Sequence, residues 1–63
     1  MEAAVRELEI ELGLAPDPAA LGRLLTRTRR CIAALAGTDS DALAVGRVAS
    51  RLYDAFLARA AAL

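Results

Sequence analysis

The sequence predicts an all-α protein, in which a short N-terminal helix is followed by an antiparallel helical hairpin. Three observations lead to this prediction. Alanine, the strongest helix former, supplies 16 of the 63 residues. Large apolar residues recur at spacings of three and four in three separate segments. Glycine, proline and helix-capping residues separate those segments. The length allows one domain, which we expect to span residues 1–63.

The first helix is expected over about residues 2–12. Its apolar residues share one face at helical spacing: Met1, Val5, Leu8 and Leu12. Gly13 is expected to end the helix, because glycine is the residue most often found just after a helix C-terminus. Residues 14–17 then form the connection.

The second helix is expected over about residues 18–36. Asp17 is a good N-cap, and Pro18 suits the first helical position, where its missing N–H costs nothing. Gly37 is expected to follow the last helical residue. A single apolar stripe runs along this helix, made of Leu21, Leu24, Leu25, Thr28, Cys31, Ile32 and Leu35.

The third helix is expected over about residues 41–61. Thr38, Asp39 or Ser40 could cap it, and Thr38 with Asp41 resembles a capping box. The second and third helices are nearly equal in length and joined by a short connection, so an antiparallel hairpin is expected.

Apolar residues occupy an unusually wide part of the third helix. Its main stripe consists of Val45, Val48, Ala49, Leu52, Phe56 and Leu63, with Arg59 as an unexplained charged member. Beside it lies a second sector of Leu43, Gly46, Ser50, Tyr53, Leu57 and Ala61. Together the two cover roughly 240° of the helix, more than one partner helix can bury.

This second sector contains the candidate binding residues. Gly46 beside Ser50 would allow a close helix approach, and tyrosine is enriched at interface hot spots. The alternatives are that Gly46 merely occupies a tolerant position and that Tyr53 and Leu57 pack beneath the first helix. We expect the site to consist of Leu43, Gly46, Ser50, Tyr53 and Leu57.

The composition also favours association with another chain. Although 57% of the residues are apolar, almost half of those are alanines, which contribute little area to a core. Small domains with a marginal core usually add disulfides, a metal or a partner. One cysteine and no histidine leave neither an internal disulfide nor the usual kind of zinc site.

No constellation of residues predicts catalysis, so we expect a non-enzymatic protein without cofactor, metal or small-molecule substrate. Cys31 lies on an apolar stripe with no histidine to activate it, and Glu7 and Glu11 are expected to face water. The net charge of zero argues against nucleic-acid binding by the arginines of the second helix, which are expected to be solvated or paired with the glutamates of the first helix. These arginines are Arg23, Arg27, Arg29 and Arg30.

Location follows from what the sequence lacks. No uncharged apolar run approaches the ~18 residues of a membrane span. The N-terminus is acidic and carries no apolar segment of the kind found in signal peptides. A cytoplasmic location is therefore expected.

The arrangement resembles the small co-chaperones of bacterial type III secretion, which help to keep the needle subunit unpolymerised. The similar features are Leu8-Glu9 on the first helix, the Leu24-Leu25 pair, the Arg29-Arg30-Cys31 region and the hairpin turn at Gly37. The chain departs from the family at Ala42-Leu43-Ala44, where relatives tend to carry a tyrosine–glutamine element, and it has no glutamine. The resemblance implies a heterodimer with a larger helical-repeat chaperone.

Two other functions stay open at this point. One is a homodimeric docking or oligomerisation module, in which two hairpins form a four-helix bundle. The other is a small nucleic-acid-associated regulator, which strongly salt-dependent binding would reveal.

Overall fold

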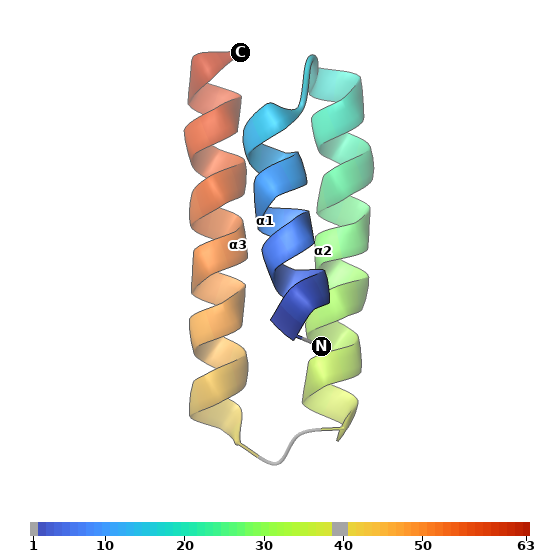
Figure 1. The fold of residues 1–63 in the computed structure, drawn as a ribbon, viewed down its shortest axis with the longest axis vertical. Helices are drawn as coiled ribbons and strands as arrows, with labels where there is room; N and C mark the ends of the chain where they lie inside the picture. The colour runs from blue at the N-terminus through green and yellow to red at the C-terminus, as the bar shows by residue number, and fades with distance from the viewer. Residues whose placement is uncertain (1, 39–40) are drawn as a thin grey trace.

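Three helices make up the regular structure of the described part of the chain, as a computed structural model shows (Figure 1). The structure describes residues 2–38 and 41–63. Helix α1 spans Glu2–Leu14, α2 spans Pro18–Thr38 and α3 spans Ala42–Ala62. No strand occurs within these described ranges, so the all-α class predicted from the sequence is confirmed.

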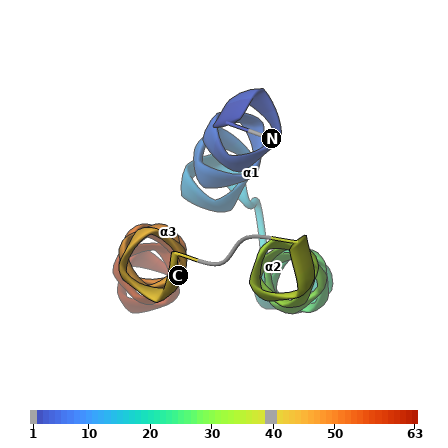
Figure 2. The same cartoon turned by 90° about the horizontal axis from the view of Figure 1, so that it is seen from below.

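The helices form an elongated bundle of 35 × 16 × 16 Å. Helices α2 and α3 run side by side in opposite directions (Figure 1). Seen along the bundle axis, the three helices stand at the corners of a triangle, with α1 over the groove between the other two (Figure 2). Because α1 has 13 residues and α2 and α3 have 21 each, α1 covers only part of the length of the hairpin.

The core lies along the axis of this triangle. Its buried apolar residues come from all three helices and the first connection: Val5, Leu8, Leu12, Ala15, Leu21, Leu35 and Leu52. Thr28 is also fully buried, and its hydroxyl donates a hydrogen bond of 2.8 Å to the carbonyl oxygen of Leu24. The predicted inner faces of α1 and α2 therefore lie where the sequence pattern placed them, except that Met1 is outside the described residues.

Helix α1 continues past the predicted stop at Gly13, which is helical and has no positive φ. The helix ends at Leu14 because Ala15 precedes Pro16, and a residue before proline is disfavoured in the α conformation. The amide of Ala15 closes the last turn with a 3.4 Å hydrogen bond to the carbonyl of Leu12. Proline, and not glycine, therefore ends this helix.

Helix α2 begins as the sequence predicts but ends later. The carboxylate of Asp17 accepts a hydrogen bond of 2.7 Å from the amide of Ala20, which satisfies one of the free N–H groups of the first turn. Gly37, predicted to follow the helix, lies inside it without a positive φ. The helix ends at Thr38, whose hydroxyl donates a 2.9 Å bond to the carbonyl of Ala34.

The cap of α3 is Asp41 and not Thr38. The Asp41 side chain accepts hydrogen bonds from the amides of Leu43 and Ala44, at 3.1 and 3.3 Å. Thr38 is already the last residue of α2, so the predicted capping box does not form. The other two candidate caps, Asp39 and Ser40, lie outside the described residues.

Candidate protein-binding face

Helix α3 places the five predicted binding residues on one solvent-facing side, which we call the outer face: Leu43, Gly46, Ser50, Tyr53 and Leu57. All five are exposed. The exposed fractions of the large side chains are 74% for Leu43, 61% for Leu57 and 37% for Tyr53. The outer face therefore presents large apolar groups that the three-helix bundle does not cover.

The spacing of these residues is that of a coiled-coil seam. The steps from Leu43 to Leu57 are three, four, three and four residues, and one further step of three reaches Ala60, which is also exposed. A 3.5-residue period keeps such positions along one line when a second helix packs beside the first. The outer face is thus suited to a partner helix lying along α3.

Helix α3 contacts α1 and the connection after it on the side that faces away from the outer face. Leu52 is fully buried on the inner side, and Arg51 pairs with Glu9 of α1 through hydrogen-bonding distances of 3.0 and 3.1 Å. Arg59 donates from Nε to the carbonyl oxygen of Ala15 at 2.7 Å. Both contacts accompany the rotation of α3 that buries Leu52.

The bond to Ala15 explains Arg59, the residue that did not fit the apolar stripe. Its side chain is half-buried and reaches the connection between α1 and α2. The Ala15 carbonyl lies beyond the last regular turn of α1, where carbonyl groups lack helical partners. Arg59 supplies the missing donor and also ties the end of α3 to the start of the hairpin.

An open hollow of about 550 Å³ lies on the N-terminal half of the outer face. Leu43, Gly46, Ser50 and Arg47 are among the residues that line it. A Cβ atom added at Gly46 would meet no heavy atom within 4 Å, so nothing in the described part of this chain fills the space above the glycine. Gly46 therefore makes a depression, while Tyr53 and Leu57 project from the other half of the face.

Two opposite charges border one edge of this face. Arg47 and Asp54 are exposed and lie seven residues apart, which puts them on the same edge of α3. Neither forms an ion pair or side-chain hydrogen bond within residues 2–38 and 41–63. Both remain free to pair with groups on another molecule.

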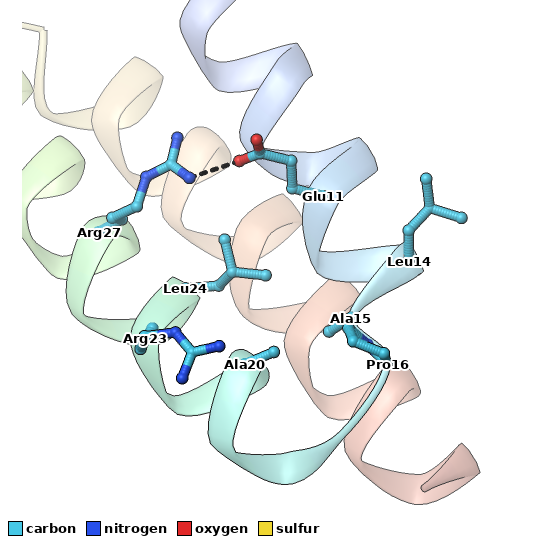
Figure 3. A pocket seen from close by; sticks show the side chains of 8 residues that line it. All are labelled: Glu11, Leu14, Ala15, Pro16, Ala20, Arg23, Leu24 and Arg27. Carbon is cyan, nitrogen blue, oxygen red and sulfur yellow. Dashed lines mark hydrogen bonds and ion pairs between the residues drawn. The ribbon is translucent and has the colours of Figure 1, made fainter.

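A second hollow, of about 440 Å³, lies between the end of α1 and the start of α2 (Figure 3). Leu24, Ala20 and Pro16 provide apolar walls, and Arg27 reaches from α2 to Glu11 on α1 with an N–O distance of 2.6 Å. Sequence reasoning missed this hollow because it exists only when α1 lies beside α2. It is open to solvent and holds no buried polar group.

Helix α1 also exposes two large apolar side chains that sequence reasoning did not single out. Ile10 is 56% exposed and Leu14 is 72% exposed. A four-residue spacing places two residues on one side of a helix, but the sequence pattern predicted residue 14 to lie in the connection, so the pair was not recognised as a face. Unlike the outer face of α3, this pair is short and has no third large apolar neighbour on α1.

The described residues also bear on four other kinds of function: thiol chemistry, metal binding, membrane insertion and nucleic-acid binding. Cys31 is a free, half-buried thiol packed against the core. No group of three or more metal-ligating side chains occurs in the part of the chain described. None of the described helices combines the length and hydropathy needed to cross a bilayer. Arg27, one of the arginines considered for nucleic acid, is engaged by Glu11.

Comparisons with known protein families, curated proteins and solved structures found no relative of this chain. No protein-family description matches the chain, and neither a curated protein nor a solved structure matches it.

Proposed function

We propose that this chain is a non-enzymatic protein-binding module whose outer face on α3 receives a helix of another chain. One observation carries the proposal: Leu43, Tyr53 and Leu57 stay exposed although the bundle has its own buried core. A contiguous exposed apolar surface on a small folded domain usually marks an interaction site. The coiled-coil spacing of the face indicates a helical partner.

The resemblance to type III secretion co-chaperones supplies one proposal for that partner, a larger helical-repeat chaperone. In that case α3 would lie in a groove of the chaperone and the complex would be a cytoplasmic heterodimer. Co-expression with the chaperone should then increase the amount of soluble chain, because binding to the folded state shifts the unfolding equilibrium.

Photo-crosslinking from Tyr53 tests the proposal directly. A benzophenone amino acid at position 53 closely replaces the tyrosine ring, and the chain is expressed in its native host. We expect a protein adduct from position 53, and much less from Ala58, an exposed residue outside the outer face, on the edge of α3 near Gly13 of α1. Equal yields from both positions, or no protein adduct, would contradict the proposal.

A charge substitution on the face gives an independent test. Leu57→Glu should abolish the crosslink from position 53 while leaving helicity by circular dichroism unchanged, because Leu57 is 61% exposed. Ala58→Glu is the matched control and should keep both properties. Loss of helicity in Leu57→Glu alone would place Leu57 in the intramolecular core instead.

A further inference from the structure

We propose that the helix received by the outer face is α3 of a second copy of this chain, packed antiparallel to form a symmetric dimer. This inference rests on the proposed function, since it names the occupant of the same face. Three properties of the outer face carry it: the order of large and small residues, the hollow over Gly46, and the charges at one edge.

The order of large and small side chains along the seam is self-complementary. When two copies run antiparallel, the seam positions meet in the pairs 43 with 60, 46 with 57, and 50 with 53. Each pair then joins one large residue to one small one: Leu43 to Ala60, Leu57 to Gly46, and Tyr53 to Ser50. Alternating large and small residues across an interface is the arrangement that lets two surfaces interdigitate.

The hollow accounts for the contact between Leu57 and Gly46 in this packing. Leu57 projects into solvent, and the space above Gly46 is open on the same helix. In the antiparallel pair, Leu57 of each copy fills the hollow over Gly46 of the other. The same patch therefore serves both copies, as a two-fold symmetric interface requires.

Charge complementarity selects the antiparallel orientation. In an antiparallel pair the same edge of both helices meets, so Arg47 of one copy faces Asp54 of the other, and the reverse contact also forms. With ~1.5 Å rise per residue, these side chains lie within about 3 Å of the same level along the axis. A parallel pair would instead place Gly46 against Gly46 and Tyr53 against Tyr53, with no acidic partner for Arg47.

Sedimentation equilibrium of the purified chain tests the inference. We expect a species of twice the 6.6 kDa chain mass. Gly46→Leu should convert it to monomer by filling the hollow, while helicity stays unchanged or rises, because the added side chain meets nothing in the monomer and leucine favours helix over glycine.

Charge exchange tests the orientation. Arg47→Asp and Asp54→Arg each place two pairs of like charges at the interface, so each should raise the dissociation constant about tenfold. The double variant restores both pairs and should return the constant to within about threefold of the wild-type value. If the dissociation constant of the dimer is unchanged by these charge substitutions and by Gly46→Leu, the proposed packing is refuted.

A strictly monomeric chain at about 100 µM would also refute the inference, since it excludes a dissociation constant below that range. The proposed function would survive that result if position 53 still crosslinks to a different protein in the host. It would fail separately if the chain is monomeric and position 53 yields no protein adduct.

Discussion

Two faces of the same helix, α3, both carry large apolar residues, but one face is buried and the other is exposed to solvent. Leu52 on the inner face is fully buried, whereas Leu57 on the outer face, five residues later, is 61% exposed. The difference lies in what stands beside each residue. Helix α1 lies over the groove between α2 and α3 (Figure 2). Leu52 belongs to the core cluster beneath it, whereas Leu57 lies outside that cluster.

This comparison shows what a hydrophobic pattern can decide. In a triangular bundle each helix buries a single stripe of roughly 100°. The third helix carries apolar residues over more than twice that arc, so part of them must stay outside. Which part stays outside depends on the rotation of α3 about its axis, and the burial of Leu52 in the core shows which rotation the bundle adopts.

Truncating one leucine on each face should give the largest contrast. Leu52→Ala should lower the free energy of unfolding by ~2–5 kcal/mol, because it leaves a cavity in a closed core. Leu57→Ala should cost less than about 1 kcal/mol at a concentration where the chain sediments as a monomer. Urea denaturation followed by circular dichroism measures both, and similar losses would remove the distinction between the faces.

Arg59 should rank next, since its side chain donates a hydrogen bond to the carbonyl of Ala15. Arg59→Met keeps most of the apolar stem and removes the donor, at an expected cost of about 1–2 kcal/mol. Arg47→Met is the matched control on the outer side and should stay within about 0.5 kcal/mol of the wild type at a concentration where the chain sediments as a monomer. If Arg59→Met leaves the free energy of unfolding unchanged, the hydrogen bond to Ala15 contributes little to stability.

The start of α3 offers a test that involves neither face. Asp41→Ala removes the side chain that accepts bonds from Leu43 and Ala44, and should cost ~1 kcal/mol. In a domain of this size that loss lowers the melting temperature by about 4–8 °C. Asp41→Asn keeps a capping oxygen and should lose clearly less, so equal melting temperatures for the two variants would argue against capping.

The glutamate pairs of α1 should have the smallest effects. Glu9→Gln and Glu11→Gln each weaken an exposed pair with an arginine, and each should cost ~0.2–1 kcal/mol at low salt. The cost should fade near 1 M salt, where the Debye length is about 3 Å. Glu7→Gln, which has no ion pair among the described residues, is the control and should show no salt-dependent loss.

Local signals in the sequence were enough to predict where the helices begin and which residues form the inner faces of α1 and α2. Asp17 caps α2 as its pattern indicates. The ends of the helices were predicted less well, because Gly13 and Gly37 can mark a helix end or lie within its last turn. For α1 that choice depends on Pro16, which follows Ala15; in α2 the helix continues through Gly37 to Thr38.

For the candidate site too, the sequence predicted some features and not others. Its residues could be selected from sequence spacing alone, but their exposure could not, since Tyr53 and Leu57 could equally have packed beneath α1. Ile10, Leu14 and the hollow beside Leu24 depend on where α1 lies relative to α2, so the sequence pattern gave them little weight.

The sequence by itself determined the helical class and the excess of apolar surface on the third helix, because both follow from residue type and spacing within one segment. Only the tertiary structure decided which part of that surface is left over, because this depends on contacts between residues far apart in the chain. The hydrogen bond between Arg59 and Ala15, 44 residues apart in the chain, is one such contact, and it forms in the same arrangement that buries Leu52 and leaves Leu57 exposed.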